Sequence, residues 1–528
     1  MWLNYFEFAA MLKNFFLVSL RLLLKNRLYT FINVAGLAVG LSLVIMLFLF
    51  VYNEFNYNLF NSNYERIYRL EGARWTVTPA VAAEEILPKC VEVEKCLRIN
   101  FNGSIVVDVG RGPEMVENWD FTDSTFFDIF SFKLLIGDPS KALSRPMSVV
   151  LSKELATKLF GGIDQAVGKT IRVRNQTDFL VTGVLDEYPA NSSIKPNALA
   201  SMVSLPALHK DPDVLKNRNN WNYHTFLLAN RGTNLDTLYK KIDVEVRHLY
   251  NISDTVTEEI FKITPLKELY FKNMEHHDNI KHGNKRFVII YLAIAIFILV
   301  IACINFINLS TARSMRRARE VGVKKVLGAH RGQLIFQFLF ESFLLTTIAL
   351  LIAFGITEFS LPVFNELLQT QLTVPYSGLL FLYVFFGAFV VSLLSGIFPA
   401  YIFSKLKPVG MLKGSFSRGN TGIALRRSLM VFQFSIAVIL IIITGIVYLQ
   451  MQHMRNLDLG FNKEQVMYFW VPQSKQVNIS SFKTDLMQNP NIIKVGRSGA
   501  IPGNTGMSWG RNIKGEEQYF SVILGDKD

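Results

Sequence analysis

The sequence has few charged residues and almost no cysteine. Of its 528 residues, 18% are charged and 50% are hydrophobic, and three are cysteines. It has no Walker motif, no HExxH and no Cys/His spacing typical of a metal site. These absences indicate that the chain does not hydrolyse ATP by itself. The composition instead indicates a membrane protein.

Two patterns come close to known sites without matching them. Gly162–Thr170 reads GIDQAVGKT, with five residues between Gly162 and Gly168 where a P-loop has four. A turn before a strand is the better interpretation. A polar cluster before the second apolar run could supply metal ligands, but neighbouring histidines in such a linker are usually solvated, so we predict no metal. The cluster consists of Glu275, His276, His277, Asp278 and His282.

The cysteines give little evidence of a disulfide framework. Cys303 lies in an apolar run and is expected to be a small core residue. Cys90 and Cys96 lie in a polar region, where a disulfide between them is one alternative and two free thiols the other. Their spacing alone does not establish the geometry that a disulfide needs.

The net charge of +13 is concentrated in three short segments beside apolar runs. They are Met1–Arg27, Ser310–Gln333 and Ser404–Arg427, and the rest of the chain is slightly acidic. A nucleic-acid-binding protein would carry its excess on a folded face or a tail, so we exclude nucleic acid as a partner. Basic segments beside membrane spans stay in the cytoplasm. Met1–Arg27 is predicted to be an amphipathic helix on the inner membrane surface that contacts membrane lipid.

Five apolar runs are long enough to cross a membrane. The predicted transmembrane helices are Leu28–Asn53, Phe287–Leu309, Leu334–Thr357, Leu379–Phe403 and Leu429–Leu449. The charge bias places the N-terminus in the cytoplasm and leaves three parts outside: 54–286, the loop 358–378, and the tail 450–528. The basic segment 310–333 and the linker 404–428 lie inside. The predicted fold class is therefore membrane α-helical with external domains.

The region 54–286 has the alternating patterns of an α+β extracytoplasmic domain. Its predicted strands are Tyr64–Leu70, Val149–Leu151, Thr170–Val173 and Phe179–Leu185, and its predicted helices are Ser152–Phe160, capped by Ser152, and Leu238–Leu249. There is also an internal repeat, because Arg21–Asn53 and Arg426–Gln450 both lead from basic residues through a span into a soluble segment. The tail, with a strand at Phe461–Val471, is expected to be the start of a second external domain.

The basic segment between the second and third spans allows two interpretations. It contains seven cations and one acid, Glu320. Val323, Val326 and Leu327 follow helical spacing, so a short helix would have one apolar edge suited to docking on a soluble partner. The alternative is a simple topology anchor. Among the polar residues within the spans we single out Asn305, Asn308 and Glu341, and Glu341 is expected to pair with a basic residue more readily than to relay protons.

The same segment resembles the signature of MacB/FtsX-like ABC transporter permeases. The matching stretches are REVGVKK at 319–325 and LGA at 327–329, flanked by IACINFINLSTA at 301–312 and QFLFES at 337–342. The resemblance implies that this segment is the coupling helix that contacts a cytoplasmic ABC ATPase subunit. The residues it assigns to that contact are Arg316, Arg319, Glu320, Gly322, Lys324, Lys325, Gly328 and Ala329.

The resemblance also implies the rest of the assembly. ATP and Mg²⁺ would bind to the partner ATPase, with no cofactor on this chain, and a periplasmic adaptor and a dimeric or pseudo-dimeric arrangement are expected. The external domain would have two parts, one formed by Asn56–Val116 and His224–Lys272 and the other inserted between them. Large members have two such halves, so we expect the natural reading frame to continue beyond Asp528.

The predicted function is that of an inner-membrane permease, not an enzyme, that couples ATP hydrolysis by its partner to motions of a periplasmic domain. Such motions would serve efflux or extraction of a substrate. The alternatives are a membrane sensor whose external domain binds a ligand and an ion-coupled transporter. The transporter should carry several charges within its spans, and Glu341 is the single acid found there.

The charge bias predicts the topology directly. Reporter fusions should place 54–286, 358–378 and the tail outside, and the three basic segments inside, because lysine and arginine near spans resist translocation. Alkaline phosphatase and fluorescent-protein fusions in cells measure both locations. A cytoplasmic location for any site within 54–286 would contradict this topology.

Overall fold

The computed structural model of the protein describes residues 16–19, 21, 23–73, 75–253, 259–272, 278, 280–312, 321–374, 382–383, 386–387, 389–393, 396–397, 420–457, 465–469, 478–499, 508–513 and 516–521. The chain divides into two units, Met1–Arg455 and Asn456–Asp528. The first unit contains long apolar helices and one large sheet, and the second contains a short helix and a hairpin.

Four helices in the described residues are long and apolar enough to cross a membrane. They are α2 (Arg27–Phe55), α9 (Lys285–Ala312), α11 (Arg331–Leu368) and α14 (Asn420–Arg455). They coincide with the first, second, third and fifth predicted spans. The fourth, Leu379–Phe403, lies mostly outside the described residues, and its described pieces are helical. Of the predicted N-terminal helix, residues 16–19, 21 and 23–27 are described, and these are helical except for a turn at Asn26.

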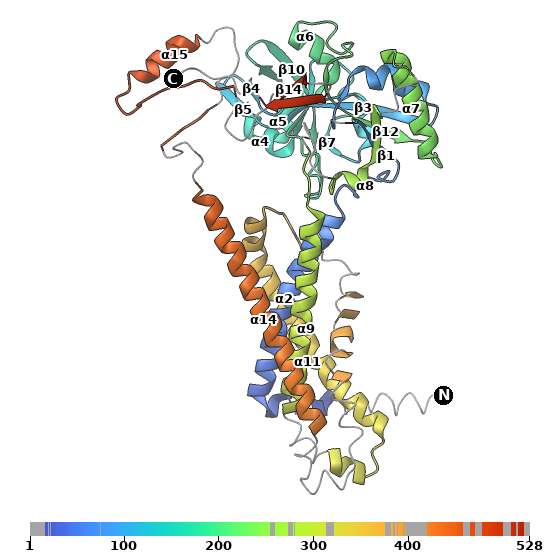
Figure 1. Ribbon diagram of the computed structural model, residues 1–528, viewed down its shortest axis with the longest axis vertical. Coiled ribbons are helices and arrows are strands. Elements are labelled where there is room, and N and C mark those ends of the chain that lie inside the picture. Colours follow the sequence, from blue (N-terminus) through green and yellow to red (C-terminus); the bar gives the residue numbers. More distant parts are fainter. Residues whose placement is uncertain are drawn as a thin grey trace. The chain divides into compact units, whose positions relative to one another are not determined.

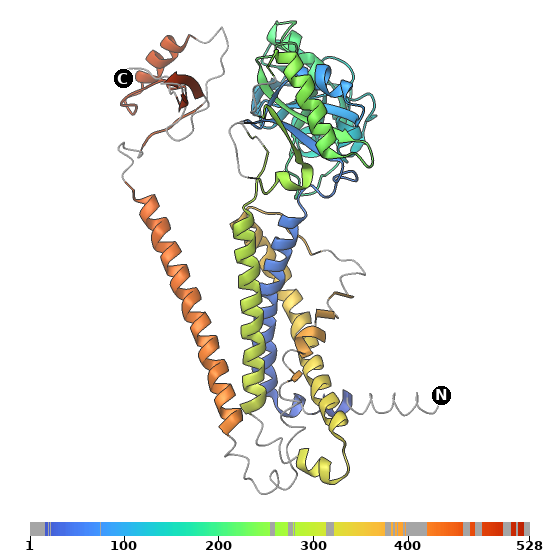
Figure 2. The same ribbon diagram turned by 45° about the vertical axis from the view of Figure 1, so that its right-hand side comes forward.

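Helix α2 packs between α9 and α11, and the three helices lie side by side in both views (Figures 1 and 2). The close approach of α2 to α9 depends on two glycines four residues apart. A Cβ at Gly40 would lie 3.1 Å from the Ala302 Cβ, and one at Gly36 would lie 3.3 Å from Asn305 Nδ2. Small residues at this spacing let two helix backbones approach closely. The Tyr29 hydroxyl lies 2.9 Å from Ser310 Oγ and joins the same two helices near the start of α2 and the end of α9.

Helix α11 is longer than the sequence predicted. We expected a span ending at Thr357 and a loop over 358–378, but the helix continues to Leu368. Leu361, Phe364 and Leu368 follow helical spacing and pack in a cluster with the ends of α2 and α9. The apolar contacts therefore extend the helix past Glu358. The loop begins at Gln369, whose left-handed backbone ends α11.

Between α2 and α9 the chain forms an α+β domain, here called the inter-span domain (Figure 1). Its strands are β1 (Ile67–Gly72), β2 (Thr78–Pro79), β3 (Val93–Phe101), β4 (Ile105–Asp108), β5 (Pro113–Val116), β6 (Trp119–Thr122), β7 (Leu134–Ile136), β8 (Ser148–Ser152), β9 (Thr170–Val173), β10 (Thr177–Leu185), β11 (Ala198–Ser201), β12 (Trp221–Ala229) and β13 (Phe261–Pro265). Its helical segments are η1 (Ala82–Ile86), η2 (Leu87–Lys89), α3 (Phe126–Ile129), α4 (Lys153–Phe160), α5 (Ile163–Ala166), η3 (Met202–Ser204), α6 (Leu205–His209), α7 (Leu235–Tyr250) and α8 (Leu266–Leu269).

The described strands form one mixed sheet of thirteen strands in the order β13-β1-β12-β3-β6-β11-β8-β10-β9-β4-β5, with β2 added to β12 and β7 to β10. Strands β1, β3, β12 and β13 are neighbours, as expected if Asn56–Val116 and His224–Lys272 fold together. The hairpin β4–β5 departs from that expectation. It pairs with β9 of the inserted part, where Val107 and Asp108 lie opposite Val173 and Arg172.

Local sequence signals account for several elements. The Ser152 side chain accepts a hydrogen bond from the Leu155 amide and caps α4, as its sequence predicts. Strand β9 has the predicted bounds, and α7 contains the predicted helix. The P-loop-like stretch forms α5 and a turn that leads into β9. Strand β1 begins later than predicted because the amides of Tyr64 and Arg66 bond to turn carbonyls.

The core lies on both faces of the sheet. Trp119 and Phe121 of β6 are fully buried in a cluster with α4 and β9–β10. Ile99, Leu199 and Phe226 belong to a second cluster, in which β3, β11 and β12 pack with α3 and α8. Because large apolar side chains are packed on both faces, the sheet is a rigid support for the two spans, α2 and α9, that flank the domain in the chain.

The second unit contains α15 (Ile479–Met487) and the hairpin of β14 (Ser508–Ile513) and β15 (Glu516–Ser521). The Asn478 side chain accepts amide hydrogen bonds and caps α15. The predicted strand at Phe461–Val471 is wrong for the part that is described, since 465–469 are irregular. No described strand pairs with it, and an extended segment without a ladder partner is not a strand.

The glycine contact between α2 and α9 leads to a stability prediction. Gly40→Leu should lower the free energy of unfolding in detergent by about 1–3 kcal/mol, because the new side chain meets Ala302. Thermal unfolding followed by circular dichroism measures this. Gly445→Leu on α14, where nothing lies within 4 Å of the new Cβ, is the matched control. Equal destabilisation by the two substitutions would show that α2 and α9 do not approach as described.

Candidate coupling sites at both ends of the spans

The first candidate site is the junction between α2, α9 and the inter-span domain. Glu54 in the last turn of α2 is 6% exposed, and its Oε2 accepts a hydrogen bond of 2.7 Å from the Tyr270 hydroxyl. The Tyr270 ring stacks on Tyr57, with ring centroids 3.5 Å apart and 7° between the planes. Tyr270 follows α8, so these contacts connect the end of the first span directly to the domain.

The chain leading into α9 is held at the same place. The Gly283 amide donates to the Tyr270 carbonyl at 2.8 Å, and a Cβ at Gly283 would lie 2.2 Å from the Tyr270 ring. Only glycine fits this contact without displacing the ring. On the other side, Asn58 and Ser193 exchange two hydrogen bonds, of 3.0 and 2.8 Å. The ends of both spans and the loop around Ser193 are thereby fixed together.

A buried ion network completes the junction. Arg69 of β1 is fully buried, and its guanidinium donates two hydrogen bonds, of 2.9 and 2.8 Å, to the carboxylate of Asp278. Its Nε donates to Glu71 at 2.7 Å, and Glu71 accepts from Thr264 at 2.8 Å and pairs with Lys272. Asp278 comes shortly before α9, so this bidentate pair attaches the second span to β1, which lies next to the edge strand β13.

The charges of this network are stabilised by one another. Burial alone would raise the pKa of Asp278, but His282, with Nε2 2.9 Å from Oδ2, and Arg69 together hold it well below its usual range. Burial and the hydrogen bond to Glu54 raise the pKa of Tyr270. Burial raises the pKa of Tyr57 to about 12. Both phenols therefore stay neutral at physiological pH, and Asp278 stays ionised.

Sequence reasoning did not find this junction. Asp278 and His282 drew attention only as metal-ligand candidates, and in the structure Asp278 pairs with Arg69 and His282 pairs with Asp278. Nothing in the sequence distinguishes Arg69, Glu71 and Glu54 from other charged residues. Arg69 and its partner Asp278 are 209 residues apart, and Glu54 and its partner Tyr270 are 216 residues apart. An arginine inside a predicted strand was the available signal, because a buried guanidinium needs a carboxylate partner.

The second candidate site is the basic segment at the opposite ends of α9 and α11. Of the predicted coupling residues, Arg316, Arg319 and Glu320 lie outside the described residues. Residues 321–326 are helical, followed by a left-handed Gly328 with φ of 95°. The helix ends there because the Ala329 amide returns to the Lys324 carbonyl, a turn that favours glycine.

The side chains of this short helix divide into a packed and an exposed set. Val321 is buried against Leu334 of α11. Lys324 Nζ donates to Gln337 at 3.1 Å, and burial together with Arg331 lowers the pKa of Lys325. The apolar edge predicted from the sequence faces away from the protein: the exposed fractions are 49% for Val323, 65% for Val326 and 80% for Leu327.

The polar residues within the spans are packed between helices. Asn305 lies against Gly36 of α2. The Asn308 Oδ1 is buried and accepts no hydrogen bond from a residue that the structure describes. Glu341 is 4% exposed, and the neighbouring Ser342 lies against the described piece around Gly396. A basic partner for Glu341 stays a prediction.

Cys90 and Cys96 are free thiols in the structure. Their sulfurs point to the Ile86 and Ala83 carbonyls of the same segment, η1, at 3.8 and 3.4 Å. Burial raises the pKa of Cys96 to about 11, so this thiol is a poor nucleophile.

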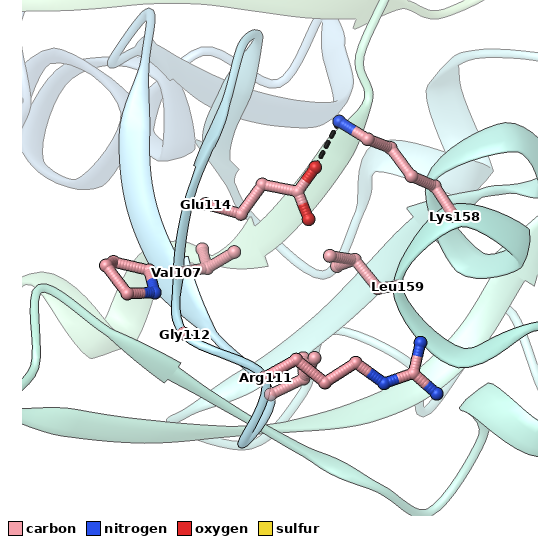
Figure 3. A pocket seen from close by; sticks show the side chains of 8 residues that line it. Val107, Arg111, Gly112, Glu114, Lys158 and Leu159 are labelled. Atoms are coloured by element: carbon pink, nitrogen blue, oxygen red, sulfur yellow. Dashed lines mark ion pairs between the residues drawn. The ribbon is translucent and has the colours of Figure 1, made fainter.

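A small cavity of about 200 Å³ lies between the β4–β5 hairpin and α4 (Figure 3). Glu114 and Lys158 form an ion pair across it, and Arg111 lies at its edge. Sites for drug-sized molecules are larger, about 300–1,000 Å³, and mostly apolar. We therefore assign no substrate to this cavity.

The junction predicts a pH dependence of stability. Asp278 has a depressed pKa in the folded state, so its contribution is present above the unfolded pKa of about 4 and is lost as pH falls below it. Asp278→Asn should lower the free energy of unfolding near neutral pH by about 3–5 kcal/mol, because Arg69 loses a buried partner. It should also flatten the loss of stability as the pH falls below about 4.

Denaturant unfolding at a series of pH values measures both effects. Asp178→Asn is the matched control, because Asp178 makes a similar two-point contact with Arg172 on the exposed surface. If the two variants lost the same stability and kept the same acid limb, the buried network would not hold the junction.

Comparisons with known proteins match both parts of this architecture. A family model described as MacB-like periplasmic core domain matches residues 30–244, and one described as FtsX-like permease C-terminal matches 292–408. The macrolide export ATP-binding/permease protein MacB of Nitrobacter winogradskyi is 24% identical over 323 residues, which are 56% of this chain and 41% of that protein. The uncharacterized ABC transporter permease YvrN of Bacillus subtilis is 30% identical over 134 residues, which are 25% of this chain and 31% of that protein.

Among solved structures, the periplasmic region of MacB from Actinobacillus actinomycetemcomitans matches with a TM-score of 0.29 at 14% identity, over 39% of this chain and 90% of that one. The chain spans less than half the length of the two curated relatives. The two family matches cover the first span with most of the inter-span domain, and the basic segment with most of its flanking spans. The chain belongs to the MacB/FtsX-like ABC transporter permease family.

Proposed function

We propose that this protein is the permease subunit of an ABC transporter that converts ATP hydrolysis by a cytoplasmic partner into motion of its inter-span domain. The domain would lie in the periplasm, and its motion would drive efflux or extraction of a substrate there or from the outer leaflet. ATP and Mg²⁺ would bind the partner. The proposal is one of force transmission, in which α2 and α9 act as levers.

The observation that carries this proposal is the junction. Glu54 ties α2 to Tyr270, and Asp278 ties the start of α9 to Arg69 inside the sheet. Two attachment points on one rigid domain mean that a shift of α2 against α9 has to be followed by the domain or has to break these contacts. The domain therefore has two discrete arrangements relative to the spans, and ATP binding can shift the balance between two such arrangements.

The short helix at the opposite ends supports a docking site for the ATPase. Val323, Val326 and Leu327 are exposed beside Lys324 and Lys325. An apolar edge framed by cations, on a segment predicted to be cytoplasmic, suits a groove with acidic rims. The resemblance assigns the same segment to ATPase contact.

The packing of the spans argues against a polar conduit among the described residues. Asn305, Asn308 and Glu341 lie at helix contacts, where their side chains are largely covered by neighbouring helices. A path for a polar substrate would instead line a water-filled opening with such groups. Force transmission needs no such path.

The docking helix yields the test. Lys324→Glu with Lys325→Glu should weaken binding of the ATPase that co-purifies with the wild-type chain by at least about thirtyfold, because reversed charges repel the partner at a desolvated contact. Leu327→Ser should weaken it through the apolar edge alone. Pull-down titrations and ATPase stimulation measure both. Glu320→Lys tests the segment's acid in the same way.

Leu367→Ser is the matched control for the apolar edge, since Leu367 is 76% exposed at the other end of α11. It should leave ATPase binding unchanged. Binding and stimulation that survive all the changes in the basic segment would reduce it to a topology anchor and would refute this proposal.

A further inference from the structure

Four cations gather at the foot of the inter-span domain, where it meets the spans. Lys195 lies in the loop that packs on the junction, and Lys281, Lys285 and Arg286 lead into α9. The Lys281 amide donates to the Ser193 carbonyl at 3.2 Å, which brings the two lysine-bearing segments together. The Lys281 ammonium lies 5.9 Å from the centre of the Tyr57 ring. The cluster is thus built on two segments of the junction, the loop around Lys195 and the stretch 281–286.

This charge is balanced only in part by carboxylates that the structure describes, since Lys281 is attracted to the nearby Glu54 carboxylate. None of the four cations forms an ion pair with a described residue. Of the described acids of the junction, Glu54 also accepts a hydrogen bond from Tyr270, and Asp278 is held by Arg69. Burial and the charge of Lys281 lower the pKa of half-buried Lys195, which shows that the two ammonium groups repel each other. An anion between them would relieve that repulsion.

The position of the cluster along the spans indicates the source of the anion. Directly after the last two cations, α9 turns apolar at Phe287, which is 60% exposed. At the same end of α2, Tyr52 and Phe55 are 59% and 43% exposed. Cations above exposed aromatic side chains match the two layers of a phospholipid, a phosphate in the headgroup region and acyl chains below it.

We propose that Lys195 and Lys281, with Lys285 and Arg286 beside them, bind the headgroup phosphate of an anionic membrane phospholipid in the leaflet next to the inter-span domain. The lipid braces the foot of the domain against α2 and α9 from outside, where Arg69 and Asp278 brace it from inside. The proposal requires that the spans cross a membrane and does not depend on the ATPase.

Hydrogen exchange of the full-length chain in nanodiscs tests this. Nanodiscs of phosphatidylcholine are compared with nanodiscs that also contain phosphatidylglycerol. In the wild type, phosphatidylglycerol should slow exchange in 189–195 and 280–286. Each lysine near an anionic surface is worth about a fivefold change in binding. Lys195→Gln with Lys281→Gln should therefore weaken lipid binding about twenty-fivefold and abolish the protection from exchange.

Lys133→Gln with Lys216→Gln, two exposed lysines elsewhere on the same domain, is the control and should keep the wild-type response. Thermal unfolding confirms that all variants are folded. The proposal is overturned if protection does not depend on phosphatidylglycerol, or if the Lys195/Lys281 variant keeps it. It is also overturned if inorganic phosphate reproduces the protection in detergent, because the site would then hold a free anion and not a lipid.

Discussion

The arrangement of this permease depends on the pair of Arg69 and Asp278. A fully buried guanidinium is costly unless its donors are all satisfied, and here Asp278 and Glu71 satisfy them. Because Arg69 belongs to the sheet and Asp278 to the approach to α9, the cost of separating the charges keeps domain and span in one relative position. An apolar contact would slide more easily, whereas a bidentate pair has a defined geometry.

The other contacts build on that fixed point. Tyr270 links α2 to the domain through Glu54, and Gly283 lets the chain pass close to the same tyrosine. Further along the spans, Gly36 and Gly40 bring α2 against α9, so that the two levers share one interface. A displacement at the basic segment would therefore travel along two helices that are joined near both ends, by Tyr29 and Ser310 and by the junction.

Sequence reasoning predicted the parts whose signals are local. Apolar runs predicted four spans that the structure describes as long apolar helices, the cap at Ser152 predicted a helix, and the i, i+3, i+4 pattern of Val323, Val326 and Leu327 predicted the exposed edge. It failed where the cause is tertiary. The extension of α11 to Leu368 depends on α2 and α9, and the placement of β4–β5 depends on β9. The junction could not be read from the chain because no pattern relates Arg69 to Asp278, whereas the family resemblance indicated the basic segment directly.

The central claim is that nucleotide-driven motion passes from the spans to the inter-span domain through the junction. The most direct measurement is hydrogen exchange in β1 and α8 of the full-length protein with its co-purified ATPase in nanodiscs, with and without ATP. The wild type should show an ATP-dependent change in these elements, and Glu54→Gln with Tyr270→Phe should lose it while residues 321–333 keep theirs. An ATP-dependent change in β1 and α8 that persists in this variant would contradict the account.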